Sequence, residues 1–253
     1  MSVVLTEFDD GVAVFTLNRP EAKNAVNLEV AHALAAAIDE FEARPDLTIG
    51  ILTGAGGTFC AGMDLKAFAR GERPSIPGRG FGGITEAPPT KPLIAAVEGW
   101  ALAGGCELAL SADLIVASRE AKFGLPEVKR GLAAAAGGLL RLPKILPYPL
   151  AMEMAITGDP LTAELAHQHG LVNRLAEPGQ ALTVARELAE RVAANGPLAV
   201  RATKQVLSMS ANYTDPDGFV AQRRFIDPVF ASADAKEGAQ AFAEKRAPVW
   251  SGT

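Results

Sequence analysis

The first residues of the chain alternate short apolar runs with a polar turn. Residues 3–8 and 12–17 are two such runs, both rich in β-branched and aromatic side chains. Asp10 and Gly11 lie between them, and an Asp-Gly pair between two apolar runs is typical of a β-hairpin. The pattern therefore predicts that the chain begins with two antiparallel strands.

Apolar residues then recur at the three- and four-residue spacing of a helix over residues 28–43. Asn27 is placed to cap the start of this helix, and Pro45 stands just beyond its end. Residues 49–53 follow as an apolar run short enough for a buried strand. The order strand, helix, strand is typical of an α/β unit with parallel strands.

A second group of predicted elements follows a stretch of different composition. Residues 70–91 are rich in proline and glycine, which predicts a long mobile loop with at most a short helix. Apolar runs at residues 93–97 and 114–117 predict strands, with a helix over residues 104–112 between them. Two strand–loop–helix units therefore succeed one another, and both have loops of small residues.

Beyond residue 146 the helical spacing dominates. It predicts a short strand at residues 171–175 and helices over the ranges 150–157, 163–169, 179–194, 197–211, 216–231 and 235–246. The chain therefore divides into an α/β core and a helical last third.

The composition is that of an ordinary globular protein and excludes several classes of function. The 253 residues carry a net charge of -5, whereas binding to nucleic acid requires a basic surface. The longest uncharged apolar stretch, residues 131–140, is far shorter than the roughly 20 residues of a membrane-spanning helix. The first ten residues lack the basic segment of a signal peptide, and two cysteines, Cys60 and Cys106, provide no disulfide framework. We therefore expect a cytoplasmic protein with no nucleic-acid or membrane partner.

Two kinds of ligand site find little support. Residues 54–57 form a glycine-rich turn, but Phe59 stands where a dinucleotide-binding fingerprint needs glycine, and no Gly-Lys-Ser/Thr follows. His32 lies far from His167 and His169, and the last two are spaced i, i+2, which does not place them on one helix face. We interpret the histidines as surface or capping residues and predict no metal site.

Two further turns of small residues are more informative, Gly62-Met63 and Gly104-Gly105. Glycine lets the backbone approach a ligand closely, and a helix beginning near Gly104 would direct its first N–H groups into the turn. Two such turns could present two N–H groups to one carbonyl oxygen, as in an oxyanion hole. The alternative is that the glycines only allow tight packing of helix on sheet.

Two glutamates follow these turns in apolar surroundings. Glu107 lies three residues into the helix that begins at Gly104, where a capping box is the structural alternative. Glu127 follows a short strand, and its structural alternatives are a solvated loop carboxylate or a salt-bridge partner of Lys129 or Arg130. If both carboxylates face one apolar cleft, burial and mutual repulsion raise their pKa values, which suits acid–base chemistry near neutral pH.

These segments together resemble the crotonase (enoyl-CoA hydratase/isomerase) superfamily. The resemblance extends from residues 18–20 to the end of the chain. It is carried by residues 59–65 (FCAGMDL), 91–99 (KPLIAAVEG), 103–109 (AGGCELA), 112–113 (AD), 123–127 (FGLPE), 131 (G) and 241–246 (AFAEKR). Each motif is weak alone, but jointly they are highly specific.

The resemblance implies an α/β fold, a crotonase-like spiral of repeated β-β-α units with a helical C-terminal region. It implies that residues 1–195 form the core with the CoA-thioester site. Residues 196–253 would serve trimerisation and complete the CoA site of a neighbouring copy. A homotrimer or a dimer of trimers is therefore expected. CoA belongs to the substrate, and no metal or redox cofactor is expected.

The resemblance also assigns roles to single residues. The backbone N–H groups of Met63 and Gly104 match the oxyanion hole that binds the thioester oxygen, and Glu107 and Glu127 match the two catalytic glutamates. Residues that match substrate- and CoA-binding positions are Ala22, Lys23, Ala61, Asp64, Leu65, Lys66, Phe242 and Lys245. For the lysines, ordinary solvated surface charge is the alternative.

The presence of both glutamates favours enoyl-CoA hydratase activity, the reversible syn addition of water to a 2-enoyl-CoA, as in beta-oxidation of fatty acids. Water would attack C3, Glu127 would supply the proton at C2, and Glu107 would orient or deprotonate the water. The alternatives are another crotonase reaction, chiefly isomerisation of an enoyl-CoA, and a non-catalytic acyl-CoA-binding protein.

Two departures from the family pattern bear on the substrate. Ala103 stands where hydratases often have glycine, and residues 133–138 (AAAAGG) replace a Pro-Gly-x-Gly-Gly segment close to the acyl pocket. Residues 141–147 and 244–250 resemble the crotonobetainyl-CoA (carnitinyl-CoA) hydratase branch. The sequence shows no obvious counter-charge for the trimethylammonium group of such a substrate.

Overall fold

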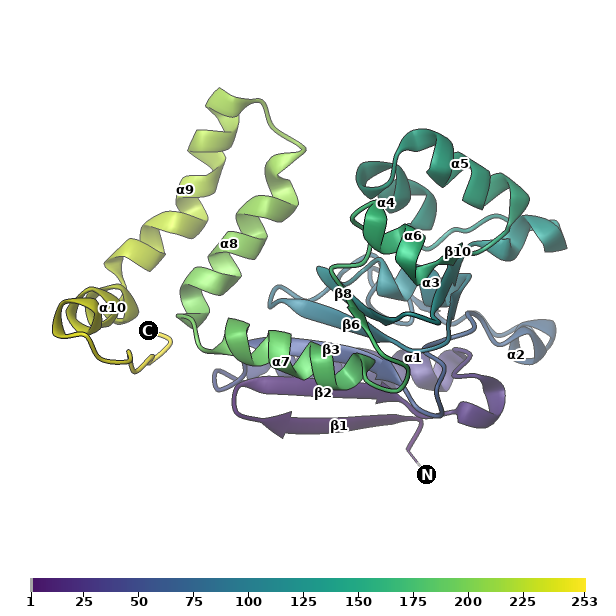
Figure 1. Cartoon of the computed structure of the whole chain (residues 1–253), viewed down its shortest axis with the longest axis horizontal. Coiled ribbons are helices and arrows are strands. Elements are labelled where there is room, and N and C mark those ends of the chain that lie inside the picture. Colours follow the sequence, from purple (N-terminus) through teal and green to yellow (C-terminus); the bar gives the residue numbers. More distant parts are fainter. Residues whose placement is uncertain (1) are drawn as a thin grey trace.

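The computed structural model describes residues 2–253 and has a six-stranded sheet at its centre (Figure 1). The strand order is β1-β2-β3-β6-β8-β11, with β1 antiparallel to β2 and the other neighbours parallel. The strands are β1 Val4–Asp9, β2 Val12–Leu17, β3 Ile49–Gly54, β6 Leu93–Val97, β8 Leu114–Ser118 and β11 Arg174–Ala176. The predicted α/β core with parallel strands is confirmed.

The predicted N-terminal hairpin and the helix after it are also confirmed. Asp10 and Gly11 turn between β1 and β2 with φ angles of 41° and 80°, left-handed values that Asp and Gly adopt more readily than most residues. α1 (Leu28–Ala43) starts after Asn27, whose side chain accepts a hydrogen bond from the N–H of Val30. This cap satisfies one of the N–H groups that a helix start leaves without a partner.

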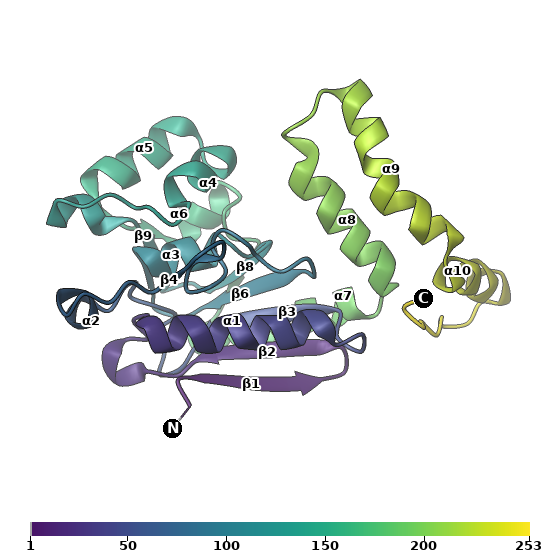
Figure 2. The same ribbon diagram turned by 180° about the vertical axis from the view of Figure 1, so that it is seen from behind.

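Helices of different character cover the two faces of the sheet. α1 packs buried side chains, among them Leu34 and Phe41, against one face (Figure 2). α7 (Ala181–Ala193) lies on the other face (Figure 1) and buries mainly alanines there, so the helix approaches the strands closely. Burial on both faces explains why the parallel strands are apolar at nearly every position.

A smaller three-stranded sheet completes the β-β-α pattern. Its order is β10-β9-β7, with β7 Trp100–Leu102, β9 Lys122–Gly124 and β10 Leu161–Thr162. β7 follows β6 and leads into α3 (Gly104–Ala109), and β9 follows β8 and leads into the 3₁₀ helix η2 (Pro126–Arg130). Each unit therefore ends in the short helix that carries one of the two glutamates.

Residues 70–91 form a folded turn and not the predicted mobile loop. Two short strands, β4 (Ser75–Ile76) and β5 (Gly80–Phe81), pair as a hairpin, and the segment buries Phe81 and Thr85. Its glycines adopt left-handed φ angles, which other residues rarely adopt. Turns of this kind have no regular spacing of apolar residues, so the sequence pattern indicates a loop.

Smaller differences concern two helices that the pattern does not predict and the ends of two other elements. The pattern predicts neither α2 (Leu65–Ala69) nor α4 (Gly138–Ile145), because the first is very short and the second contains Pro143. α3 ends before the predicted residue 112, where the N–H groups bond three residues back in a 3₁₀ turn. β11 begins after residue 171, since only its three residues pair with β8.

The remaining helices form a cap over the small sheet and an arm that extends from the core (Figure 1). The helices of the cap are α4, α5 Tyr148–Thr157 and α6 Ala163–Gln168, and those of the arm are α8 Pro197–Ser210, α9 Asp215–Ala231 and α10 Ala233–Glu244. One further 3₁₀ helix, η1 (Pro20–Ala22), follows β2. Within residues 2–253 no helix is both long and apolar enough to cross a membrane.

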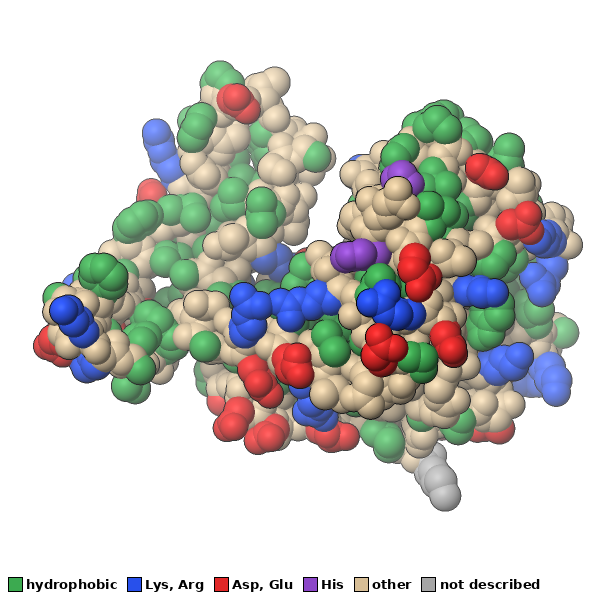
Figure 3. Space-filling view, in the orientation of Figure 1, with side chains coloured by type: hydrophobic (Ala, Val, Ile, Leu, Met, Phe, Trp, Pro, Cys, Tyr) green, Lys and Arg blue, Asp and Glu red, His purple; other side chains and the backbone are tan. Residues whose placement is uncertain are grey.

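The arm is tied to the core at its base and carries an apolar surface beyond it. The ammonium group of Lys204 donates to the carboxylate of Asp113 at 2.6 Å and to the carbonyl of Lys91 at 3.0 Å. No residue of α9 is buried, and large side chains such as Phe219 and Phe230 are exposed. Figure 3 shows hydrophobic side chains along this arm, in green.

Candidate active site

A cavity of about 560 Å³ opens between the turns that follow β3, β7 and β9. Of the residues predicted for the site, the structure brings together in its wall Lys23, Ala61, Met63, Leu65, Gly104, Glu107 and Glu127. The wall also contains residues that the sequence analysis did not single out as site residues, among them Phe68, Ser75, Phe81, Glu86, Trp100 and Arg130.

The loop that carries Met63 is held on both sides by backbone hydrogen bonds. Cys60 exchanges two of them with β7, at 2.9 and 3.0 Å. The N–H of Val26 donates to the Gly62 carbonyl at 2.8 Å, and the N–H of Asp64 donates to the Val26 carbonyl at 2.9 Å. The bonds hold the backbone on either side of Met63 and leave the N–H of Met63 without an acceptor among the described residues.

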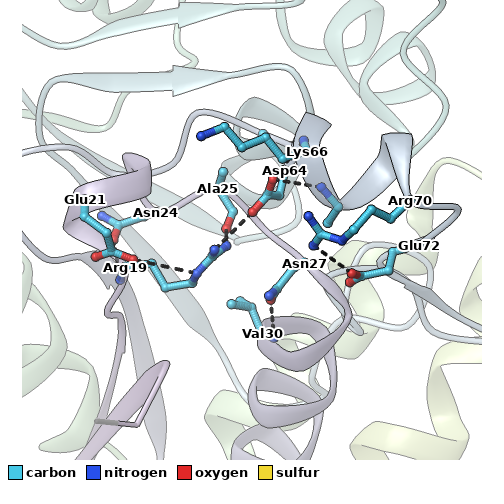
Figure 4. Close-up of polar contacts among 12 residues, drawn as sticks. Arg19, Glu21, Asn24, Ala25, Asn27, Val30, Asp64, Lys66, Arg70 and Glu72 are labelled. Carbon is cyan, nitrogen blue, oxygen red and sulfur yellow. Dashed lines mark hydrogen bonds and ion pairs between the residues drawn. The ribbon is translucent and has the colours of Figure 1, made fainter.

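Arg19 and Asp64 fix the same loop through their side chains (Figure 4). The guanidinium of Arg19 donates to the carboxylate of Asp64 at 3.0 Å and to the carbonyl of Ala25 at 2.6 Å. The other carboxylate oxygen of Asp64 accepts from the N–H groups of Lys66 and Ala67 and so caps α2. Both oxygens of Asp64 are thus engaged with the protein itself, beside the cavity and not in its wall.

The two turns meet because glycines let their backbones approach. A Cβ built on Gly62 would lie 3.2 Å from the backbone nitrogen of Gly104 and 2.8 Å from the Cβ of Ala103. A Cβ on Gly105 would lie 2.2 Å from the carbonyl oxygen of Cys60. A side chain at Gly62 or Gly105 would therefore push the turns apart. The structural alternative for these glycines, tight packing, is therefore confirmed. The same packing brings the two turns of the site together.

This packing leaves two N–H groups beside each other at the cavity. Gly104 is the first residue of α3, so its N–H has no acceptor within the helix. Neither this N–H nor that of Met63 donates to any acceptor in residues 2–253. Two unpaired N–H groups from adjacent turns can bind one carbonyl oxygen, which is the arrangement of an oxyanion hole.

Ala103 holds a strained backbone conformation in this turn, with φ of 51° and ψ of −129°. Such strain costs about 1–3 kcal/mol, more than the roughly 0.5–1 kcal/mol that glycine loses through its freer unfolded state. We therefore expect Ala103→Gly to raise the free energy of unfolding by about 1 kcal/mol. Denaturant titration at one fixed protein concentration measures the change, and a glycine variant less stable than the parent would contradict the strain.

Glu107 is held by the backbone of the segment before α4. The residue is 3% exposed, and its Oε1 accepts hydrogen bonds from the N–H groups of Ala136 at 2.7 Å and Gly138 at 2.9 Å. The capping-box alternative is wrong, because the carboxylate is bonded to this segment. Burial raises the pKa of Glu107 above its usual value, although these N–H groups and the charge of Arg141 oppose the rise.

Glu127 is the less satisfied of the two acids. Its Oε2 is buried and has no hydrogen-bond partner among residues 2–253. Burial raises the pKa of Glu127, and the neighbouring charge of Glu107 raises it further, against the effect of Arg130. The salt-bridge alternative is wrong, because Lys129 pairs with Asp159 at 2.5 Å and Glu127 forms no ion pair with Arg130 within residues 2–253. The effect of the Glu107 charge on Glu127 and the shared cavity wall indicate that the two carboxyl groups lie in one site.

The raised pKa of Glu127 predicts how stability depends on pH. The folded state favours the neutral acid, so the stability it contributes is fully present below the ordinary pKa of 4.5 and is lost as pH rises through the raised pKa. We expect Glu127→Gln to melt at a higher temperature than the parent at pH 8, with the gap closing below pH 4.5. Thermal melts across this range measure it, with exposed Glu153→Gln as the control. Equal gaps at all pH values would contradict the cause.

The other predicted binding residues do not line the cavity of this chain. Ala22 and Lys66 are sequence neighbours of wall residues without being part of the wall themselves. Phe242 and Lys245 lie at the end of α10, which is at the far end of the molecule from α2 (Figures 1 and 2). Phe242 is 88% exposed. Within one chain, these two residues therefore stand apart from the site.

Phe81 and Glu86 belong to the cavity wall, and the sequence analysis missed them. Both come from residues 70–91, whose composition indicates a loop. A large aromatic residue inside a glycine-rich stretch is a signal that could have found Phe81. Its ring packs so closely on the oxyanion turn that a Cβ on Gly104 would lie 2.5 Å from a ring carbon.

Comparison with known proteins identifies the family to which the chain belongs. A sequence model of the family described as enoyl-CoA hydratase/isomerase matches residues 7–253. A carnitinyl-CoA dehydratase from Salmonella typhi is 44% identical over 246 residues, which cover 94% of each chain.

Solved structures with the same fold include two hydratases of CoA thioesters. An enoyl-CoA hydratase from Mycobacterium tuberculosis H37Rv is 60% identical, with a TM-score of 0.98 over 100% of both chains. A carnitinyl-CoA hydratase from Mycobacterium avium is 43% identical, with a TM-score of 0.80 over 100% of both chains. The predicted crotonase fold is confirmed, and the chain belongs to the enoyl-CoA hydratase/isomerase (crotonase) family.

Proposed function

We propose that the protein is an enoyl-CoA hydratase that adds water reversibly to a 2-enoyl-CoA. The observation that supports this most strongly is the convergence of four groups on one cavity. These are the unpaired N–H groups of Met63 and Gly104 and the carboxyl groups of Glu107 and Glu127. The family implies an acyl-CoA thioester as substrate. The two N–H groups can bind the oxygen of this thioester, and the two carboxyl groups can hold a water.

In the proposed mechanism the thioester oxygen accepts hydrogen bonds from the N–H groups of Met63 and Gly104. These donors stabilise the negative charge that develops on this oxygen when a nucleophile adds at C3. A water held by both carboxyl groups attacks C3, and Glu107 orients this water and accepts the proton that it releases. Glu127 delivers a proton to C2 on the same face. One water is consumed, and transfer of the proton between the two acids restores their starting states.

The environments of the two acids suit these roles. Glu127 is buried, lacks a partner at Oε2 and has a raised pKa, so it can carry a proton near neutral pH. Glu107 accepts two N–H groups, which favour its ionised form and hold it as an acceptor for water. Because the two groups interact, their protons belong to the pair, and the division of roles is part of the proposal.

Mixing the purified protein with a short 2-enoyl-CoA tests the activity. We expect loss of the absorbance of the conjugated thioester and a product heavier by the mass of one water. A product of unchanged mass with a shifted double bond would instead identify an isomerase. Binding of the thioester without any turnover would identify a non-catalytic acyl-CoA-binding protein.

We further propose that the arm completes the CoA site of a neighbouring copy in a trimer or a dimer of trimers. The exposed apolar side chains of α9 and the distance of Phe242 and Lys245 from their own cavity support this. Light scattering should give a mass of three or six chains, and Phe242→Ala should raise KM for the thioester with little change in kcat. A fully active monomer would contradict the proposal. The absence of a further cofactor, a role in beta-oxidation and a cytoplasmic location stay predictions.

One observation favours a second candidate, hydration of a substrate with a quaternary ammonium group, as the names of the carnitinyl-CoA relatives suggest. Glu86 lines the cavity, and its carboxylate has no ion-pair partner among the described residues. It lies next to the turn of Gly80 and Phe81 and supplies the counter-charge that the sequence analysis did not find.

Glu86→Gln tests this candidate. We expect the variant to raise KM for a crotonobetainyl thioester by up to about fivefold, because one exposed cation–carboxylate contact contributes up to about 1 kcal/mol, and to leave KM for crotonyl-CoA unchanged. Initial rates with both thioesters measure the ratio. An equal change for both substrates would rule out a charge-selective role for Glu86.

A further inference from the structure

Arg141 stands between two segments of the cavity wall. It lies in the first turns of α4, and its guanidinium donates to the carbonyl of Thr85 at 2.5 Å and to that of Ala136 at 3.3 Å. Thr85 belongs to the segment that carries Phe81 and Glu86. Arg141 therefore connects this segment to the one that holds Glu107.

The second contact is directly linked to Glu107. Ala136 uses its carbonyl to accept from Arg141 and its N–H to donate to Glu107. Gly137, which follows, has φ of 101°, and a Cβ there would lie 2.1 Å from the guanidinium of Arg141. Gly138 then donates the second N–H to Glu107. The guanidinium thus packs on the very turn whose two N–H groups hold the carboxylate.

We propose that Arg141 is a positioning residue for Glu107: it fixes the turn of residues 136–138 and places a positive charge near the carboxylate. The kinetic part of this proposal rests on the proposed hydratase function. Arg141 is half-buried and forms no ion pair with any carboxylate of residues 2–253. No ion pair therefore neutralises the guanidinium, and its positive charge can stabilise the ionised form of Glu107.

The charges around Glu107 come from several elements. Arg141 on α4 favours the ionised form of Glu107. Glu127 on η2 lines the same cavity, and the charge of Glu107 raises the pKa of Glu127. Cys106 on α3 is a buried thiol with a raised pKa. The charge of Arg141 lowers the pKa of Glu107 against the larger effect of burial. Loss of Arg141 should therefore raise the pKa of Glu107, so that the acid limb of the pH profile of kcat moves to higher pH.

Three variants separate positioning from simple stabilisation. Arg141→Met removes both the positive charge and the two hydrogen bonds to carbonyl groups. Arg141→Lys keeps the charge but cannot donate to both carbonyl groups in the geometry of a guanidinium. Lys144→Met is the control, because it removes an exposed charge from the same helix. We expect Arg141→Met to lower kcat about tenfold to a hundredfold, as small displacements of catalytic groups do, with the acid limb shifted upward. Arg141→Lys should return the acid limb of the pH profile to its parental position but recover only part of kcat. Lys144→Met should leave both the acid limb and kcat unchanged.

A readout independent of turnover is the carboxyl titration of Glu107 in ¹³C-glutamate-labelled full-length protein, assigned through Glu107→Gln. We expect a higher pKa in Arg141→Met than in the parent and a value near the parent in Arg141→Lys. A variant that loses thermal stability while both titration and acid limb stay unchanged would overturn the proposal. If the parent protein shows no hydration at all, the proposed function fails, and the titration still decides the role of Arg141.

Discussion

Glu107→Gln and Glu127→Gln are each expected to lower kcat for hydration by about a hundredfold to ten-thousandfold. Glutamine keeps the shape and an acceptor oxygen of the side chain, so the amide oxygen at position 107 can still accept from the N–H groups of Ala136 and Gly138. What the amide loses is the ability to accept and return a proton. Initial rates with a 2-enoyl-CoA measure the effect, at saturating substrate so that changes in binding do not contribute.

A matched control and the double variant sharpen this test. Glu153→Gln changes an exposed glutamate on α5 and should leave kcat unchanged. Because the two acids share one proton cycle, the double variant should be little slower than the slower single variant. If either single variant kept more than about half of the parental kcat, far above the loss expected for a general acid or base, that glutamate would have no catalytic role.

Gly104→Ala is expected to lower kcat by about a hundredfold to a thousandfold, the loss measured when one oxyanion-hole donor is removed. The added Cβ would lie 2.5 Å from the ring of Phe81, so the ring or the turn must move. Displacement of the turn moves the N–H of Gly104 away from the thioester oxygen. Steady-state rates measure the loss, with circular dichroism to verify that the fold is retained.

A second substitution distinguishes this cause from general damage. Phe81→Leu in the Gly104→Ala background makes room for the new methyl group and should recover a large part of kcat. Gly196→Ala is a suitable control, because a Cβ there has no neighbour closer than 3.7 Å. Failure of Phe81→Leu to restore any activity would contradict the proposed steric origin of the defect.

The sequence is sufficient to predict the parts of this fold that depend on regular periodicity. The hairpin around Asp10, the helix capped by Asn27 and the parallel strands all follow from alternation, helical spacing and turn residues. The helices of the arm follow from the same spacing. What the pattern misses is structure built by glycine turns and proline, namely the hairpin in residues 70–91 and α4 with its internal Pro143.

The candidate site divides in a similar way. Met63, Gly104, Glu107 and Glu127 could be named from the sequence because small-residue turns and apolar-flanked acids have a stated chemistry and a family resemblance. The partners of Glu107 could not be named in this way. They are backbone N–H groups and therefore have no residue signature, and Arg141 acts through carbonyl groups, one of them far from it in sequence. Such contacts exist only once tertiary structure brings distant turns together.

Turnover of a 2-enoyl-CoA in heavy-oxygen water, followed by mass spectrometry of the product, tests the central claim most directly. Hydration through Glu107 and Glu127 predicts one heavy oxygen in the product, located on C3, and no labelled product from Glu127→Gln within the same time. An unlabelled product, or labelling that survives loss of both glutamates, would contradict the claim that these two acids add water across the double bond.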